Sequence, residues 1–242
     1  MHLLSTLGQA LEAAADQHHL LAASDLTALG LDHKQVSRLC DERVIERVVR
    51  GLYRVSGTRS PLQDIAAATS RHGAGVASHV SALFLHGCEV DPPTVPHVTL
   101  PPGATSRTTI SELHRSPLGR GDVTRRSGIP VTTLARSIVD SAAFLSEGQL
   151  HDIVAAAFAG RRTTLELVQR SAQGVEEAPG RLGSGRLRAV LAGWADPIRP
   201  DSVAEATVLR RIAGFGLPRP VTQHDVVDRD GSFVARVDLA WP

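Results

Sequence analysis

Basic side chains gather in one short stretch of the sequence, between residues 33 and 54. Arginine and lysine suit the acceptor edges of guanine, glutamine suits adenine, and all three can hold phosphate groups. The residues of this kind in the stretch are Lys34, Gln35, Arg38, Arg43, Arg47 and Arg50. Residues 1–32 contain no lysine or arginine, so the positive charge is concentrated locally. The stretch therefore predicts a contact surface for double-stranded DNA.

Two expected helices and a hairpin would position these side chains. Ser24 can cap a helix over residues 24–29, and a second helix is expected over 33–42, with its basic and amide side chains facing away from its apolar ones. Apolar residues on both sides of Arg50-Gly51 then indicate a β-hairpin. This order is typical of a winged helix-turn-helix, which places its second helix in a DNA major groove.

A simpler alternative exists for each of these side chains. Lys34, Gln35 and Arg38 could form an ordinary solvated helix face, although basic groups near the start of such a helix favour DNA contact. The hairpin arginines suit phosphates better than bases, because phosphates take most protein–DNA hydrogen bonds. Arg54 is equally compatible with a phosphate contact and with a plain surface position.

Composition places the chain among ordinary globular proteins. It has 242 residues, 42% of them hydrophobic and only 3% aromatic, and a net charge of +1, which argues against general affinity for polyanions. Cys40 and Cys88 have no CxxC partner, which favours a reducing compartment. The sequence begins without a basic secretory leader, and no apolar run approaches the roughly 18 residues needed to span a membrane. A cytoplasmic protein is the expectation.

The rest of the sequence predicts an α+β protein. A first helix is expected over residues 3–18, and mixed helices and strands follow the hairpin. Residues 173–185, rich in glycine and charge, are the best linker candidate. Three domains are expected, over residues 1–57, 60–172 and 186–242. Further helices are expected after Ser60, Ser78 and Thr132 or Thr133, and over 146–159, 163–172, 186–194 and 202–214, with strands in PHVTLP, TISELHRS, near 122–125, VTQHDVV and FVARVDLAW.

Histidines recur every seven residues at His72, His79 and His86. Positions seven apart on a helix lie about 10 Å from each other, too far for shared zinc ligation, so no metal site is expected. Capping or packing roles are favoured for these histidines. Ser78 is expected to be a helix N-cap, and His114 a polar strand residue, with a partner-facing role left open.

The order of RGLYRV, SHVSALFLHG, PHVTLP, LHRSPL and GIPVTTLARSIVDSA resembles that of AbiEi-type proteins. These are the antitoxin and transcriptional-regulator halves of type IV toxin–antitoxin pairs. The resemblance covers roughly residues 3–172. It implies a winged helix that binds the operon's own promoter, an α/β antitoxin domain, and a toxin partner that resembles nucleotidyltransferases.

The end of the sequence, AEATVLRRIAGFGLPRPVTQHDVV and FVARVDLAWP, is similar to the start of an endonuclease-like domain related to very-short-patch repair enzymes, of PD-(D/E)xK type. That resemblance implies metal ligands at Asp238 and on a following Glu-x-Asp-Gly strand, with Glu205 matching an upstream helical acid. The second strand does not occur before Pro242. Because metal-assisted phosphodiester hydrolysis needs convergent carboxylates, we expect a truncated, inactive fragment.

These observations favour a DNA-binding autoregulator that acts as an antitoxin, is not an enzyme and uses no cofactor. Its expected partners are the double-stranded DNA of its own promoter and a nucleotidyltransferase-like toxin. Two alternatives stay open. One is a repair-type endonuclease targeted by the winged helix, and the other is an orphan transcriptional regulator without a toxin.

Overall fold

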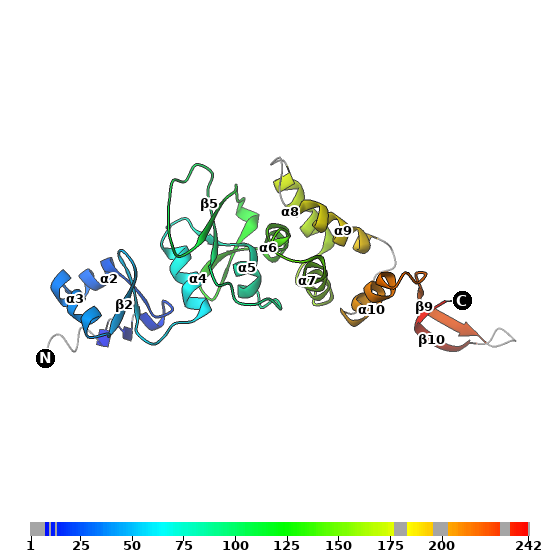
Figure 1. Cartoon of the computed structure of the whole chain (residues 1–242), viewed down its shortest axis with the longest axis horizontal. Coiled ribbons are helices and arrows are strands. Elements are labelled where there is room, and N and C mark those ends of the chain that lie inside the picture. Colours follow the sequence, from blue (N-terminus) through cyan, green and yellow to red (C-terminus); the bar gives the residue numbers. More distant parts are fainter. Residues whose placement is uncertain are drawn as a thin grey trace. The chain divides into compact units, whose positions relative to one another are not determined.

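The computed structural model describes residues 8–9, 11–12, 14–176, 183–195, 203–227 and 233–241, without the side chains of 203–207 and 210. It is a mixed structure of helices and sheets, consistent with the expected α+β class. The chain divides into two compact units, Met1–Ser137 and Ile138–Pro242 (Figure 1). The boundary falls inside the segment 60–172. Among the described residues, no helix combines the length and apolarity that a membrane crossing requires.

The first unit begins with a small antiparallel sheet and two helices. Seven of the sixteen residues of the helix expected over 3–18 lie outside the described residues; among the others, 8–9, 11–12 and 14–15 are helical, and 16–18 form a turn. The sheet has the order β1-β3-β2, so the first strand pairs with the last. The elements in chain order are β1 (Leu20–Ala22), α2 (Ala23–Ala28), α3 (His33–Asp41), β2 (Ile45–Val49) and β3 (Leu52–Val55).

Local side-chain chemistry explains where these helices start. At α3, the Gln35 backbone N–H donates to Asp32 Oδ1 and the Asp32 N–H donates to Gln35 Oε1, both at 2.8 Å. At α2, Ala22 is the N-cap and its N–H donates to Asp25 Oδ2 at 3.1 Å. The prediction of a Ser24 cap was therefore wrong by two residues, because the Asp25 carboxylate reaches back to the chain ahead of the helix. Gly51, with φ of +83°, makes the β2–β3 turn.

A five-stranded sheet follows, in the order β6-β5-β4-β8-β7. The β5–β6 and β4–β8 pairs are parallel, and the β4–β5 and β7–β8 pairs are antiparallel. The helix α4 begins where predicted, with Ser60 Oγ accepting from the Gln63 N–H at 3.2 Å. The elements are α4 (Pro61–Ser70), β4 (Val76–Ala77), α5 (His79–Leu85), β5 (His97–Leu100), β6 (Glu112–Arg115), a 3₁₀ turn (Arg120–Asp122), β7 (Val123–Arg126) and β8 (Ile129–Thr132).

Both faces of β5 are covered, since all four of its residues are buried. Val98 and Leu100 pack with Ala68 of α4 on one face. His97 and Thr99 point to the other face, because successive strand residues alternate, and Thr99 there donates to Ser78 at the start of α5. Figure 1 shows α4 and α5 beside the sheet that contains β5. The α5 side of the sheet is thus the side that carries polar chemistry.

The two sheets of the first unit share a hydrophobic core. Leu20 of β1 and Leu52 of β3 belong to the same buried cluster as Ile65 of α4 and Val131 of β8. The buried Gln63 strengthens this connection, since its Nε2 donates to the His18 carbonyl and to Thr58 Oγ1, each at 2.9 Å. The segments 1–57 and 60–137 are therefore joined by packing as well as by the chain.

The second unit contains helices and a terminal hairpin. Trp194 meets Phe158 edge to face, with ring centroids 5.2 Å apart, and joins α9 to α7. The antiparallel hairpin β9–β10 exposes much of its apolar surface, including Phe233 at 65%. The elements are α6 (Leu134–Ser141), which crosses the unit boundary, α7 (Glu147–Ala159), α8 (Leu165–Glu176), α9 (Ser184–Ala195), α10 (Val203–Gly214), β9 (Val221–Val227) and β10 (Phe233–Ala240).

The linker expected over 173–185 is shorter than predicted. The helix α8 continues to Glu176 and α9 begins at Ser184, so both ends of the predicted linker are helical. The residues 177–182 lie outside the described part. Val175 is 6% exposed, so burial of an apolar side chain helps to extend α8 past Ala172, where the sequence pattern indicated an end.

Candidate functional site

The helix α3 presents its polar face to solvent. Lys34 and Arg38 are exposed, whereas Val36 and Leu39 are buried in the hydrophobic core that α2 and α3 share with the three-stranded sheet. Arg38 Nε donates to Glu42 Oε1 at 2.7 Å, and the side chains of this pair are 71% and 49% exposed. A pair so accessible to water contributes little stability, so Arg38 can exchange Glu42 for another anion at small cost.

Gln35 has a structural role that the sequence analysis did not anticipate. Its Oε1 accepts the Asp32 N–H and thereby completes the cap of α3. The amide nitrogen of Gln35 is a donor that this cap does not use. Gln35 therefore stabilises the helix start, and its nitrogen can still donate to a ligand without breaking the cap.

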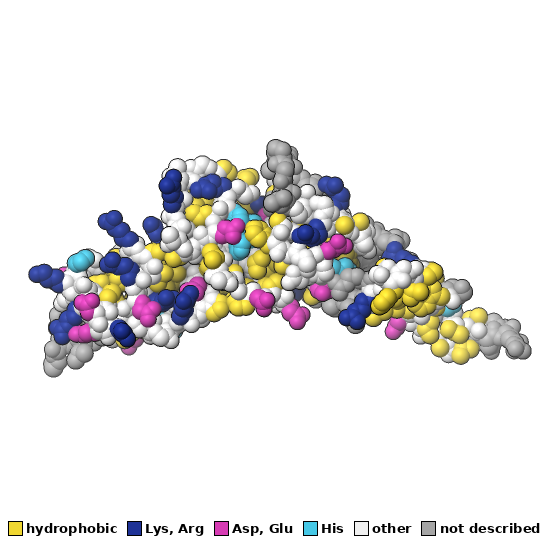
Figure 2. Space-filling model, viewed as in Figure 1, with side chains coloured by type: hydrophobic (Ala, Val, Ile, Leu, Met, Phe, Trp, Pro, Cys, Tyr) yellow, Lys and Arg dark blue, Asp and Glu magenta, His cyan; other side chains and the backbone are white. Residues whose placement is uncertain are grey.

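Three further arginines surround the β2–β3 hairpin. Arg43, Arg47 and Arg50 are all exposed. The Arg47 guanidinium lies 5.7 Å from the centroid of the Tyr53 ring, and its Nη2 donates to Tyr53 Oη at 3.4 Å. The ring thus restricts the orientation of Arg47 while the charge stays in solvent. Together with Lys34 and Arg38, these arginines form what we call the basic surface, and Figure 2 shows separate dark blue side chains spread over the region of α3 and β2.

Arg54 differs from the other cations of the stretch. Its side chain is only 16% exposed, and it donates to Glu46 at 3.1 Å and to Asp64 at 3.3 Å. Asp64 also accepts from Arg59 at 3.2 Å. Arg54 thus bridges β2 to α4. Of the two interpretations left open for Arg54, this geometry favours neither a phosphate contact nor a plain surface position, but a structural ion pair.

A second constellation lies on the α5 side of the five-stranded sheet. Three histidines meet there, His79 at the first residue of α5, His97 on β5 and His114 on β6, and we call them the histidine cluster. One potential ligand atom from each lies within 4.8 Å of the other two. His97 Nδ1 and His114 Nε2 are 3.0 Å apart, and the His79 and His114 rings stack with centroids 3.7 Å apart.

Strand register explains how these residues meet. In the parallel β5–β6 pair, His97 lies opposite Glu112 and Thr99 lies opposite His114. Residues two apart on a strand share a face, so His97, Thr99, Glu112 and His114 all belong to one face of the sheet. The start of α5 packs on that face and adds His79. Glu112 Oε2 lies 3.8 Å from His97 Nδ1, and Glu112 Oε1 lies 3.9 Å from His114 Nε2.

Neighbouring hydroxyls hold the cluster in place. Thr99 Oγ1 donates to Ser78 Oγ at 2.8 Å, and Ser78 Oγ lies 2.9 Å from His79 Nδ1. Ser81 Oγ accepts the His97 backbone N–H at 2.8 Å. Ser78 does occupy the N-cap position of α5, but its side chain makes no cap hydrogen bond. The expectation of a capping hydroxyl was wrong because the sheet and His79 compete for it.

Burial within the cluster favours the neutral imidazole of His97. His79 is 7% exposed and His97 8%, and this burial lowers the pKa of His97 below its ordinary value, while the Glu112 carboxylate acts in the opposite direction. His79 also has φ of +53°, in the left-handed region that non-glycine residues seldom occupy. Strained backbone of this kind often marks functional positions.

The seven-residue histidine series does not form a site. His72 Nδ1 lies 2.7 Å from Ser106 Oγ, and His86 Nε2 donates to the Thr132 carbonyl at 2.8 Å. Only His79 of the series enters the cluster. The approach of His97 to His114 was missed because it comes from the pairing of two strands, and the one sequence signal was that each histidine falls in an expected strand, PHVTLP or TISELHRS.

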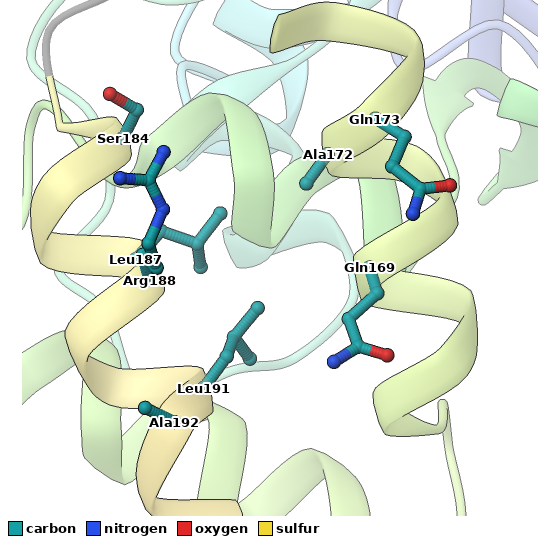
Figure 3. A pocket seen from close by; sticks show the side chains of 8 residues that line it. All are labelled: Gln169, Ala172, Gln173, Ser184, Leu187, Arg188, Leu191 and Ala192. Atoms are coloured by element: carbon teal, nitrogen blue, oxygen red, sulfur yellow. The ribbon is translucent and has the colours of Figure 1, made fainter. Parts of the chain in front are cut away.

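A pocket of ≈ 370 Å³ lies between α8 and α9 in the second unit. Ala172, Leu187 and Leu191 supply apolar lining, and Gln169 and Arg188 supply polar groups (Figure 3). Among the described residues that line this pocket, none is acidic.

Of the two acidic residues that resemble nuclease ligands, the structure describes the side chain of Asp238. Asp238 on β10 accepts a hydrogen bond from Gln223 Nε2 at 3.1 Å and does not belong to any cluster of three potential metal ligands in that part of the chain. The Glu205 side chain lies outside the described residues.

Comparison with known proteins gives a likeness of fold. No family model matches the sequence, and no curated protein matches it significantly. Among solved structures, the crystal structure of the RV2827C protein from Mycobacterium tuberculosis is similar, with a TM-score of 0.52. The two are 13% identical in sequence, and the match covers 93% of this chain and 89% of that one. The likeness is one of chain architecture.

Proposed function

We propose that the chain binds double-stranded DNA through the basic surface and regulates its own promoter. The observation that carries the proposal is the gathering of five exposed cations, Lys34, Arg38, Arg43, Arg47 and Arg50, on α3 and the adjoining hairpin. The first 32 residues add no lysine or arginine, and the net charge of the whole chain is only +1. The basic surface can therefore attract a polyanion locally, although the whole chain is nearly neutral.

The order of elements supports a winged helix-turn-helix. In this interpretation α2 and α3 are the helix pair, β1 joins the sheet and β2–β3 is the wing. The second helix would enter the major groove and the wing arginines would contact phosphates. Lys34 and Arg38 stand one turn apart on the solvent face of α3, which suits two neighbouring contacts in one groove.

The acidic residues within the stretch do not cancel this surface. Glu42 pairs with Arg38 in an exposed contact that DNA phosphate can replace. Glu46 faces Arg54, which is not one of the surface cations. Counterion release by the remaining cations supplies affinity for DNA, and base contacts by Lys34 or Arg38 supply specificity.

Binding to the upstream region of the gene tests the proposal. Replacing Lys34 and Arg38 together by alanine should weaken specific binding by about 1–3 kcal/mol for each side chain that reads a base edge. The matched control is Arg161→Ala/Arg170→Ala, which removes two exposed cations from the second unit. Fluorescence anisotropy with a promoter duplex and a scrambled duplex separates specific from general affinity. Equal affinities for both double variants would reject the assignment.

The antitoxin role is proposed on the AbiEi-like motif order alone. Co-expression with the product of a neighbouring nucleotidyltransferase-like gene tests it, and rescue of growth is the expected result. The Lys34→Ala/Arg38→Ala variant should still rescue, because its changes are confined to the basic surface. If the full chain gives no rescue, an orphan regulator is the remaining form of the proposal.

A further inference from the structure

We propose that His79, His97 and His114, with the Glu112 carboxylate, form a binding site for a divalent first-row transition-metal ion. Three imidazoles and a carboxylate are a ligand set that zinc and related ions accept. The site goes beyond DNA binding, because it lies on the five-stranded sheet and uses none of the cations of the basic surface.

The distances between the ligand atoms suit binding of one shared metal ion. Two nitrogen ligands at about 2.0–2.1 Å from one tetrahedral ion are roughly 3.3 Å apart. His97 Nδ1 and His114 Nε2 are 3.0 Å apart, so a small movement admits an ion between them. The carboxylate oxygens of Glu112, at 3.8 and 3.9 Å from these nitrogens, stand where a fourth ligand is needed.

The distances between the ring centroids show which two side chains must move apart when an ion binds. Imidazoles on one tetrahedral ion have centroids roughly 5 Å apart. The His97–His114 and His79–His97 centroids are 5.3 and 5.6 Å apart, close to that value. The His79 and His114 rings are stacked at 3.7 Å and must separate by about 1.5 Å. Metal binding therefore converts a stacked pair into two ligands of one ion.

The surroundings favour ligation over protonation. Burial disfavours the charged imidazolium of His97, and the neutral imidazole is the form that binds a metal. The Thr99–Ser78–His79 chain of polar contacts restrains the His79 ring, as hydroxyl and carbonyl partners do around established metal ligands. The Glu112 side chain is 51% exposed, which gives an ion a path from solvent.

Titration of the untagged full chain with Zn²⁺ and Co²⁺ tests the site. Calorimetry should give one tight equivalent of Zn²⁺ per chain, and Co²⁺ should give the visible absorption of a tetrahedral complex. Binding should weaken as the pH falls below about 6.5, because protons compete for the imidazoles. Absence of a stoichiometric equivalent, or an octahedral cobalt spectrum identical to that of the aqueous ion, would overturn the proposal.

Variants locate the binding. His114→Gln changes the most exposed of the three histidines and should lower Zn²⁺ affinity at least about 100-fold, since loss of a group that only orients a ligand already costs 10–100-fold. Ser78→Ala, a positioning change, should fall in that 10–100-fold range. The control is His18→Gln/His19→Gln, an adjacent pair outside the cluster, which should bind as wild type does. Circular dichroism identifies any variant that fails to fold, and Glu112→Gln, at an exposed position, then replaces it.

Two results would reject the assignment. Equal Zn²⁺ affinity of His114→Gln and wild type would place the ion elsewhere, and loss of binding only in the His18→Gln/His19→Gln variant would place it at that pair. The Lys34→Ala/Arg38→Ala variant should retain full metal affinity, so failure of the DNA proposal and failure of the metal proposal are distinguishable.

Discussion

The basic surface and the histidine cluster present their chemistry in opposite ways. The five cations of the basic surface lie within 17 consecutive residues, 34–50, and reach directly into solvent. The three histidines come from separate elements, and two of them, His79 and His97, are buried. An exposed charged surface depends little on packing, whereas a convergent ligand set exists only if the sheet register and the helix position are both correct.

The largest difference is expected between the stability cost of a core substitution near the histidine cluster and that of a substitution on the basic surface. Leu83 of α5 is fully buried, and Leu83→Ala should lower the free energy of unfolding by about 2–5 kcal/mol through a cavity next to the sheet. Arg50→Ala, on the basic surface, should stay within about 0.5 kcal/mol of wild type. Urea unfolding followed by circular dichroism measures both. Equal costs for the two changes would remove the contrast between a packed site and a surface site.

A second prediction separates two kinds of arginine in one short stretch. Arg54→Ala should cost about 1–2 kcal/mol of stability, since it leaves Glu46 and Asp64 without their largely buried partner. Arg38→Ala should cost less than about 0.5 kcal/mol, because its ion pair is exposed. For DNA affinity the order should be reversed, with Arg38→Ala weakening binding more than Arg54→Ala does. Arg54→Lys is the matched control, which keeps the charge and loses the forked geometry. A DNA defect in Arg54→Lys without a stability defect would contradict this division.

The salt dependence of DNA binding tests which cations of the basic surface contact phosphates. Each phosphate contact that Arg47→Ala or Arg50→Ala removes should reduce the slope of log K against log[salt] by about 0.9. Arg170→Ala in the second unit should leave the slope unchanged. The slope is obtained from anisotropy titrations at several salt concentrations, and an unaltered slope in both hairpin variants would exclude these arginines from the interface.

The smallest expected effect is the pH dependence caused by His97. Burial lowers the pKa of His97 in the folded chain, so below about pH 6.5 the unfolded chain takes up the proton first and the free energy of unfolding falls. Above that pH the imidazole is neutral in both the folded and the unfolded chain, so His97 does not make the free energy of unfolding depend on pH. His79, His114 and Glu112 face the same space, and Glu112 reduces the shift. His97→Gln should flatten the loss of stability between pH 7 and 5 (roughly the span of the titration), as measured in metal-free buffer. An unchanged pH profile would show that another group causes it.

Sequence patterns predicted those parts of the fold that are determined locally. Ser60-Pro61 starts α4 and Gly51 lies in the hairpin turn, as expected, because a cap and a left-handed turn depend on a few neighbouring residues. The strand β4 was missed because Val76–Ala77 is too short for a periodic pattern and is held by β5 and β8. Its place in the sheet is a tertiary property.

The same distinction applies to the candidate sites. The cations of α3 could be found from charge and helical spacing alone. The approach of His97 to His114 could not, because it depends on the parallel register of β5 and β6 across 17 residues. Gln35 was assigned to DNA without its cap role, since the reciprocal contact with Asp32 depends on where α3 begins.

The pairing of β4 with β8 has a consequence for the order of folding during synthesis. The strands of the first sheet are all present once Val55 has left the ribosome, whereas the five-stranded sheet needs Val131, the partner of Ala77. At about 5–20 residues per second, those two events are separated by roughly 4–15 s. In the later part of that interval the strand with His97 exists without the completed sheet around it. The basic surface can therefore form on the nascent chain well before the histidine cluster can.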